Sequence, residues 1–295
     1  MLTWPEETVA ANGQIPRWQH PGSNLCLDLH GDPAKANLVV FSDGNHHMAL
    51  QEAMALFQKE QPEVQQIFYV TTPPGPVLQL LRHGSLQIGN LILSVKPHVF
   101  ISPPAVLDNL VREKYMQRHM PFMRNQGSVL LVKKGNPKNI SGVADLNRED
   151  VRLFLSNPTT ETVSYQGYVR TLADVAAREK VTLSFLTDDP PSTKICYGEQ
   201  IHHREAPQAI IDGRADVSVV YYHLALRYTR IFPELFAMIP LGGTIDQPQP
   251  YPENVISLSH AGLIGDGGGW GAVFLDFLAS EAITDIYTHH GLLRA

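Results

Sequence analysis

Short apolar runs alternate with stretches of helical periodicity along most of this chain. Residues 38–41 form an apolar run, and after a polar turn Leu50, Met54 and Phe57 recur at the spacing of one helix face. The unit repeats at residues 67–70, where the following turn is rich in threonine and proline. Alternation of this kind predicts a doubly wound α/β protein in which helices connect the strands of parallel sheets.

The alternation continues almost to the end of the chain. Its main interruption is the glycine-rich stretch 265–269, which we expect to be a flexible loop. Apolar runs and helical stripes predict the remaining elements. These are strands at residues 98–101, 129–132, 151–155, 181–186 and 217–222, and helices after Pro103, around residues 169–175 and around residues 274–278.

The composition is that of an ordinary globular protein. The 295 residues are 43% hydrophobic and 18% charged, which is enough apolar material for one or two sizeable cores. A net charge of -6 and a pI near 6.1 provide no basic field for a phosphate backbone, so we expect no nucleic-acid partner. The apolar runs are far shorter than the ~20 residues that cross a bilayer, so we expect a soluble protein.

The first residues bear on the cellular location. Residues 1–14 include Glu6 and Glu7 and contain no continuous apolar core behind a basic end, so they do not resemble a secretory signal. We therefore expect either a cytoplasmic protein or a periplasmic protein from which a signal peptide has been removed.

Motifs of covalent catalysis are missing from the sequence. It contains no Gly-x-Ser-x-Gly elbow and no dinucleotide fingerprint, and Trp270 follows the glycine-rich stretch where a phosphate loop has Lys-Ser/Thr. Asp188 and Asp189 precede two prolines, which favours a solvated turn over an acid/base pair. Cys26 and Cys196 lack any metal-ligand spacing, and whether they pair is open. We expect neither an enzyme nor a bound cofactor.

Five segments, in order, resemble the type II periplasmic substrate-binding proteins of ABC importers, and among them the molybdate-binding branch. The middle segment is the most specific, because it joins a valine-rich strand, a Lys-Gly-Asn-Pro turn and an Asn-Pro loop. The five segments cover residues 38–60, 98–110, 129–158, 204–225 and 274–282.

This resemblance implies an α/β fold of two lobes, joined by a hinge, with the ligand held in an interlobe cleft. Lobe I is expected to comprise residues 37–121 and 226–295, lobe II residues 122–225, and residues 1–36 an irregular extension on lobe I. The ligand implied is a small oxyanion such as molybdate, tungstate or sulfate. The protein is expected to be a monomer whose partners are this ligand and the membrane subunits of an importer.

The resemblance also implies ligand-binding residues in the strand-end turns of lobe I. Ser42 and Asn45 lie in the first turn, Asn45 at the position where the molybdate branch usually has a hydroxyl residue. An asparagine there also suits a plain helix N-cap. In the second turn Thr72 and the backbone N–H of Gly75 are candidates, although the prolines of residues 73–76 remove donors that an oxyanion uses.

In lobe II the corresponding loop carries Thr160 and Thr162, whose hydroxyls can bind an anion near a helix N-terminus. Glu161 between them is unfavourable, because a carboxylate repels an anion. Tyr221 occupies the position of the family's ligand-facing tyrosine. The alternative for Tyr221 is an aromatic side chain packed between strands.

Thirteen histidines raise a second hypothesis for the ligand. His46, His47 and His98 fall near expected strand ends or helix starts, where imidazoles can bind a transition metal. Adjacent histidines on a helix point about 100° apart and seldom bind one ion. The alternatives to an oxyanion carrier are therefore a protein that binds a metal or metal complex, and a cytoplasmic solute sensor of the same fold.

Overall fold

The computed structural model describes residues 19–20, 23–24, 28–88, 91–187, 192–199 and 201–295. The chain divides into two compact units: unit 1 contains Asn125–Ile256, and unit 2 contains Leu25–Arg124 and Ser257–Ala295. Two short strands, β1 (Gln19–His20) and β2 (Ser23–Asn24), pair with each other. Cys26 and the Asp188–Asp189 turn lie outside the described residues.

Unit 2 is built on a seven-stranded sheet with the order β16-β9-β15-β8-β4-β5-β3. The strands β5, β4 and β8 are parallel neighbours, and every other pair in the sheet is antiparallel. A separate hairpin joins β6 (Leu86–Ile88) and β7 (Leu91–Leu93). The sheet strands are β3 (Asp28–His30), β4 (Leu38–Ser42), β5 (Ile67–Thr71), β8 (Val99–Ser102), β9 (His119–Arg124), β15 (Leu258–Leu263) and β16 (Leu293–Arg294).

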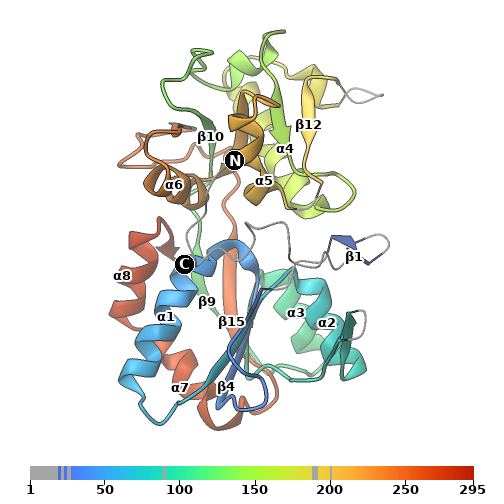
Figure 1. Ribbon diagram of the computed structural model, residues 1–295, viewed down its shortest axis with the longest axis vertical. Helices are drawn as coiled ribbons and strands as arrows, with labels where there is room; N and C mark the ends of the chain where they lie inside the picture. Colours follow the sequence, from blue (N-terminus) through green and yellow to red (C-terminus); the bar gives the residue numbers. More distant parts are fainter. Residues whose placement is uncertain (1–18, 21–22, 25–27, 89–90, 188–191, 200) are drawn as a thin grey trace. The chain divides into compact units, whose positions relative to one another are not determined.

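Helices cover both faces of this sheet (Figure 1). One face packs against α1 (His47–Glu60), α7 (Gly268–Leu278) and α8 (Glu281–His289). The other packs against α2 (Pro74–His83) and α3 (Pro104–Arg112). A 3-10 turn, η1 (Gly44–His46), connects β4 to α1.

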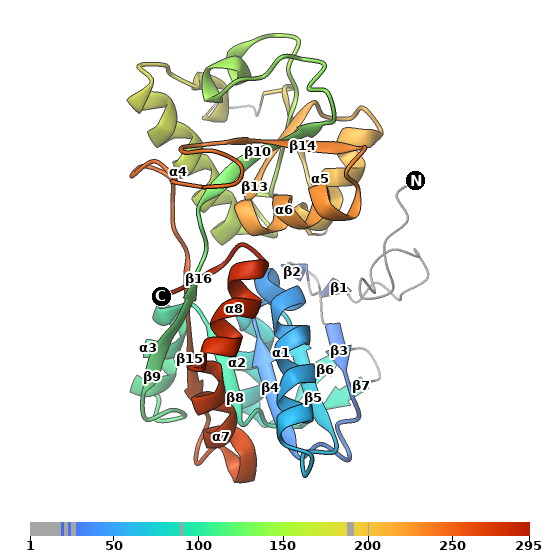
Figure 2. The same cartoon turned by 90° about the vertical axis from the view of Figure 1, so that its left-hand side faces the viewer.

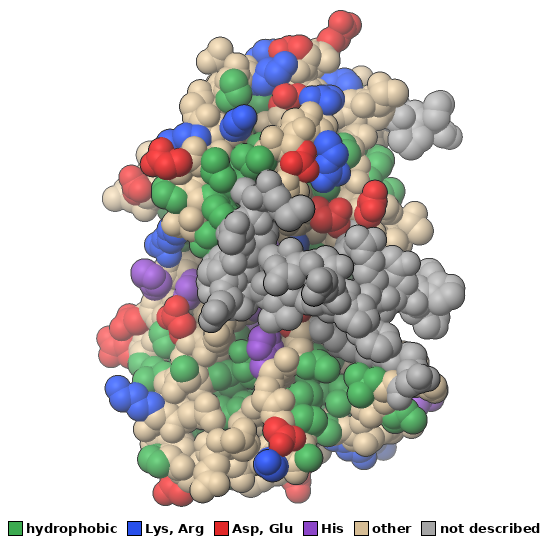
Figure 3. Space-filling model, viewed as in Figure 1, with side chains coloured by type: hydrophobic (Ala, Val, Ile, Leu, Met, Phe, Trp, Pro, Cys, Tyr) green, Lys and Arg blue, Asp and Glu red, His purple; other side chains and the backbone are tan. Residues whose placement is uncertain are grey.

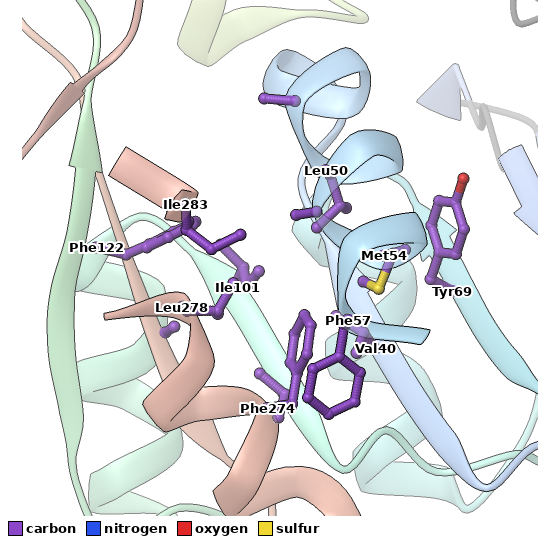
Figure 4. Packing of buried hydrophobic residues seen from close by; sticks show 14 of the residues in the cluster. Val40, Leu50, Met54, Phe57, Tyr69, Ile101, Phe122, Phe274, Leu278 and Ile283 are labelled. Carbon is purple, nitrogen blue, oxygen red and sulfur yellow. The ribbon is translucent and has the colours of Figure 1, made fainter. Parts of the chain in front are cut away.

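Burial on both faces explains why residues 38–41 of β4 are all apolar. Leu38 and Val40 belong to the core under α1, α7 and α8, whereas Val39 and Phe41 belong to the core under α2 and α3. Side chains alternate between faces along a strand, so a strand covered on both sides needs an unbroken apolar run. Figure 4 shows the first of these cores, with Phe57 of α1 against Phe274 of α7.

Unit 1 has a five-stranded mixed sheet with the order β12-β11-β13-β10-β14. Helices α5 and α6 pack against its middle strands (Figure 2). The strands are β10 (Ser128–Lys133), β11 (Leu153–Leu155), β12 (Ile195–Tyr197), β13 (Val217–Tyr221) and β14 (Phe236–Pro240). The helices are η2 (Val143–Asn147), α4 (Thr162–Arg178), η3 (Ser184–Leu186), α5 (His202–Ile211) and α6 (Tyr222–Ile231). No helix in the described part of the chain is both long and apolar enough to span a bilayer.

Three details differ from the sequence analysis. The strand expected at 181–186 is wrong: Lys180 adopts φ 59° after α4, and the buried residues that follow form η3 instead. The sheets are mixed rather than parallel, because β9, β15, β10 and β14 run antiparallel to their neighbours. The glycine-rich stretch 265–269 is not all loop, since α7 begins at Gly268.

The boundaries of the units also differ from those expected for the lobes. Residues 226–256, expected in lobe I, belong to unit 1, because β14 pairs with β10 from Val129 opposite Pro240 to Lys133 opposite Phe236. The N-terminal extension of residues 1–36 contains one strand of the unit 2 sheet, since β3 pairs with β5.

Replacing Phe57 by alanine tests the core of unit 2. Phe57 is fully buried, and its ring lies 5.0 Å from Phe274 and 5.1 Å from Phe277 between centroids. Removing such a ring leaves a cavity that costs about 3–5 kcal/mol. We expect the free energy of unfolding of Phe57→Ala, measured by urea denaturation, to be lower than that of the wild type by that amount. A loss below about 1 kcal/mol contradicts this packing.

Candidate ligand-binding loops

The carboxyl ends of three parallel strands meet at one edge of the unit 2 sheet. Ser42 of β4 lies opposite Thr71 of β5 and Ile101 of β8, and the backbone N–H of Thr72 donates to the carbonyl of Ser42 at 2.9 Å. The chain leaves β4 toward the α1 face and leaves β8 toward the α3 face. Strand ends from which connections depart to opposite faces are where open α/β sheets bind ligands.

A buried hydrogen-bond network anchors the loop after β4. His46 is fully buried, and its Nε2 and Nδ1 atoms lie 2.7 Å from Ser42 Oγ and 2.9 Å from the Tyr287 hydroxyl. Asp43 accepts hydrogen bonds from the backbone N–H of Asn45 and from Ser259 Oγ. Asn45 itself is half-buried and lies within η1, so the N-cap of this turn is Asp43.

Burial shifts the titration of Asp43 in this network. Desolvation outweighs the hydrogen bonds from Asn45 and Ser259 and raises the pKa of Asp43 to about 6. The loop therefore holds a carboxyl that is neutral in mildly acidic solution and ionised above neutrality. An ionised carboxylate this close to the strand ends disfavours an anion, and a protonated one does not.

Two buried hydroxyls stand at the ends of the neighbouring strands. Thr72 follows β5 and Ser102 ends β8, both are at most 2% exposed, and neither hydroxyl has a hydrogen-bond partner among the described residues. Buried polar atoms are almost always hydrogen-bonded, so each such hydroxyl is available to a water molecule or a bound ligand. The prolines at 73–74 and 103–104 remove backbone donors beside them. Gly75, in the first turn of α2, is exposed.

Unit 1 repeats this arrangement after β11. Ser156 follows the strand and is fully buried, and its hydroxyl and that of Thr160 have no partner in the described part of the chain. Asn157 accepts from the backbone N–H groups of Thr159 and Thr160 at 2.9 and 3.3 Å, which shapes the loop. Thr162 is exposed and donates its hydroxyl to the carbonyl of Pro158 at 2.9 Å, so that hydroxyl serves the loop itself.

Glu161 has a structural role at the start of α5. Its Oε2 accepts the backbone N–H of His202, the first residue of that helix, at 2.9 Å. Burial raises the pKa of Glu161 to about 7, and the nearby charge of Glu205 adds to the rise. Backbone hydrogen bonds from His202 and Asn157 oppose it. The carboxylate that looked unfavourable for an anion is thus turned toward a neighbouring helix and is half protonated near neutrality.

Tyr221 closes β13 within a cluster of aromatic rings. It is 9% exposed, its ring lies 5.0 Å from Tyr168 and stacks on His223 at 5.8 Å between centroids. An added Cβ on Gly167 would lie 3.8 Å from the Tyr221 hydroxyl, so this glycine leaves room beside it. Tyr222 begins α6 and donates to the carbonyl of Ile245.

The three histidines considered for a metal fall at opposite ends of the parallel strands, with His46 and His47 after β4 and His98 before β8. His46 follows the carboxyl end of β4, and His47 Nδ1 lies 3.0 Å from the carbonyl of Gly44. His98 precedes the amino end of β8, where its Nδ1 accepts from the backbone N–H of Val39. Among the described residues no group of three or more His, Cys, Asp or Glu side chains is arranged to hold a metal ion.

The surface charge agrees with the composition. On the face drawn in Figure 3, Lys and Arg side chains are interspersed with Asp and Glu on each unit. The candidate loops hold ligand donors of another kind, namely neutral hydroxyls and backbone N–H groups. Neutral donors at strand ends and helix starts suit a small anion, whose charge they stabilise without a full counter-charge.

Two α/β units, each with buried hydroxyls after a parallel strand, define a solute-binding protein of the type II periplasmic class. The family model described as bacterial extracellular solute-binding protein matches residues 38–293. The chain belongs to this family of bacterial extracellular solute-binding proteins, and the resemblance seen in the sequence is confirmed. No curated protein sequence matches the chain.

Solved structures of similar fold belong to proteins that are described for different solutes. A substrate-binding domain from Clostridium difficile, described as part of a molybdenum ABC transporter, has TM-score 0.61 and 16% identity over 88% of this chain and 98% of its own. The sulfate-binding protein SubI from Mycobacterium tuberculosis has TM-score 0.60 and 14% identity over 88% and 86%. Iron-bound HitA from Pseudomonas aeruginosa has TM-score 0.55 and 13% identity over 85% and 83%. Identities this low establish the fold alone.

Replacing Asp43 by asparagine tests the electrostatics of the first loop. Because the folded pKa is about 6 and the ordinary value is 3.8, ionisation of Asp43 costs stability progressively as pH rises from about 4 through 6. Asparagine keeps the acceptor for Asn45 and carries no charge. We expect Asp43→Asn to stabilise the ligand-free protein at pH 8 by on the order of 2–3 kcal/mol, and much less at pH 4. Denaturant unfolding at both pH values checks this, and a pH-independent difference contradicts it.

Proposed function

We propose that this protein captures a small oxyanion of the molybdate, tungstate or sulfate type outside the cytoplasmic membrane and delivers it to the membrane subunits of an ABC importer. One observation carries the proposal. The hydroxyls of Thr72, Ser102 and Ser156 are buried directly at the ends of three parallel strands and have no partner among the described residues. An oxyanion, which accepts several hydrogen bonds, satisfies such donors.

Each unit offers hydrogen-bond donors of its own to the ligand in the proposal. Unit 2 supplies Thr72, Ser102 and the loop that holds Ser42 and Asn45, and unit 1 supplies Ser156 and Thr160. Tyr221 is proposed to donate its hydroxyl from the end of β13. Two-lobed receptors couple ligand capture to a change between conformations, and the family match supports that behaviour for this protein.

Asp43 and Glu161 are compatible with an anion because both resist ionisation. Their pKa values are about 6 and about 7, so binding of an anion nearby favours the protonated forms further. Anion capture in this site is therefore accompanied by proton uptake near neutral pH. The same carboxyls attract a cation when they are ionised. This charge favours a metal ion as the second candidate ligand.

A thermal-shift screen identifies the ligand. We expect one or more of molybdate, tungstate, sulfate and phosphate to raise the melting temperature, because a ligand that binds only the folded state stabilises it by mass action. Divalent metals, ferric complexes and small organic acids complete the panel. Stabilisation by metals alone, with no response to any oxyanion, would falsify the oxyanion proposal.

Removing the two buried hydroxyls of unit 2 separates binding from folding. Thr72→Val and Ser102→Ala take away hydroxyls that have no hydrogen-bond partner among the described residues, so the ligand-free protein should be as stable as the wild type or more stable. Each change should weaken the binding of the oxyanion found in the screen by about tenfold or more, because a hydrogen bond to a charged ligand is lost. Calorimetric titration measures both Kd values.

Thr171→Val is the matched control. Thr171 is also fully buried, but its hydroxyl accepts the backbone N–H of Val255 at 3.1 Å within unit 1. This variant should lose about 1–3 kcal/mol of stability and keep its affinity. If Thr72→Val and Ser102→Ala destabilise the protein as Thr171→Val does and bind the oxyanion normally, their hydroxyls are structural and the proposed site is wrong.

A further inference from the structure

Two histidine rings meet on the α3 side of the unit 2 sheet. His119 begins β9 and His260 lies on β15, and their Nδ1 atoms are 2.8 Å apart. On the far side of the first ring, His119 Nε2 lies 3.0 Å from Oδ1 of Asp108 in α3. None of these three residues belongs to the histidines that the sequence singled out or to the candidate loops.

The carboxylate decides which nitrogens carry protons. Asp108 can only accept, so His119 Nε2 bears the hydrogen, and Nδ1 of the neutral ring keeps a lone pair. Because that lone pair faces His260 Nδ1, one proton lies between the two nitrogens. A metal ion can replace this shared proton, because both imidazole nitrogens point toward it.

We propose that His119 Nδ1 and His260 Nδ1 bind a divalent transition-metal ion, with Asp108 holding the His119 ring in place. A tetrahedral ion with metal–nitrogen bonds of about 2.0–2.1 Å places two ligands about 3.3 Å apart, so the rings need to separate by about half an ångström. His260 changes from the Nδ1–H to the Nε2–H tautomer when the ion enters, which leaves both rings neutral. A histidine ligand whose other nitrogen donates to a carboxylate is the usual arrangement in metal sites.

The surroundings permit this separation and give the ion access to water. The register between β15 and β9 shifts between Ser259 and His260, and such a bulge re-aims the side chain next to it. The side chains of His119 and Asp108 are 13% and 63% exposed. Two protein ligands leave the remaining coordination positions to water, so we expect an exchangeable ion. Cu²⁺ binds such nitrogen sites more tightly than Zn²⁺ or Ni²⁺, and adjacent positions of its preferred square-planar geometry place two nitrogens about 2.9 Å apart, so it is the best probe.

Titration of the whole protein with Cu²⁺, without any oxyanion present, tests this site. We expect one equivalent to bind with an electron paramagnetic resonance spectrum that shows coupling to two imidazole nitrogens. His119→Gln and His260→Gln should each abolish that two-nitrogen signal. Asp108→Asn should keep the signal but raise the Kd for Cu²⁺ about 10- to 100-fold, because the ring loses its orienting carboxylate.

His290→Gln is the control. His290 is also hydrogen-bonded to a carboxylate, since its Nε2 lies 2.8 Å from Oε1 of Glu52. Neither residue is part of the proposed His119–His260 site. This variant should keep the spectrum and the Kd of the wild type. The proposal is overturned if His260→Gln, shown by its unfolding curve to be folded, retains the wild-type signal, or if only His290→Gln loses it. Because no oxyanion is present, neither result depends on the proposed transport function.

Discussion

Parallel pairing of β4 with β5 and β8 is the constraint on which the candidate site of unit 2 depends. The pairing of Ser42 with Thr71 and Ile101 sets three strand ends side by side, and everything that follows them starts from the same edge. Sheet hydrogen bonds thus position the hydroxyls of Thr72 and Ser102, which form no hydrogen bond to another described residue. Rigid strands with polar ends are an economical way to keep ligand donors fixed and unsatisfied until a ligand arrives.

Each unit contains one buried carboxyl group in a similar environment. Asp43 and Glu161 each accept a backbone N–H at the start of a helical segment, and burial raises the pKa of each toward neutrality. A helix start normally favours an ionised carboxylate. Here desolvation outweighs that preference, so the two loops carry carboxyls that can change charge with little cost near pH 7.

The sequence predicted the local part of this structure and missed the non-local part. The apolar runs placed β4, β5, β8, β10 and β13 correctly, because a strand buried on both faces has an unbroken apolar pattern. Ser102 and Ser156 follow predicted strands and could have been found by applying to them the rule used for Ser42. The contact between His46 and Tyr287 joins residues 241 positions apart, and no spacing in the sequence indicates it.

The division of the chain has a consequence for synthesis on the ribosome. Unit 1 is nearly one continuous segment, so its sheet can be completed once β14 has emerged. Most of unit 2 precedes the main segment of unit 1 in the chain, yet β15, α7 and α8 supply one side of the core under α1, and they are made last. The earlier segment of unit 2 must therefore wait, with part of the apolar side of α1 uncovered, until residues 257–295 arrive. A chaperone that shields this face would act during that interval.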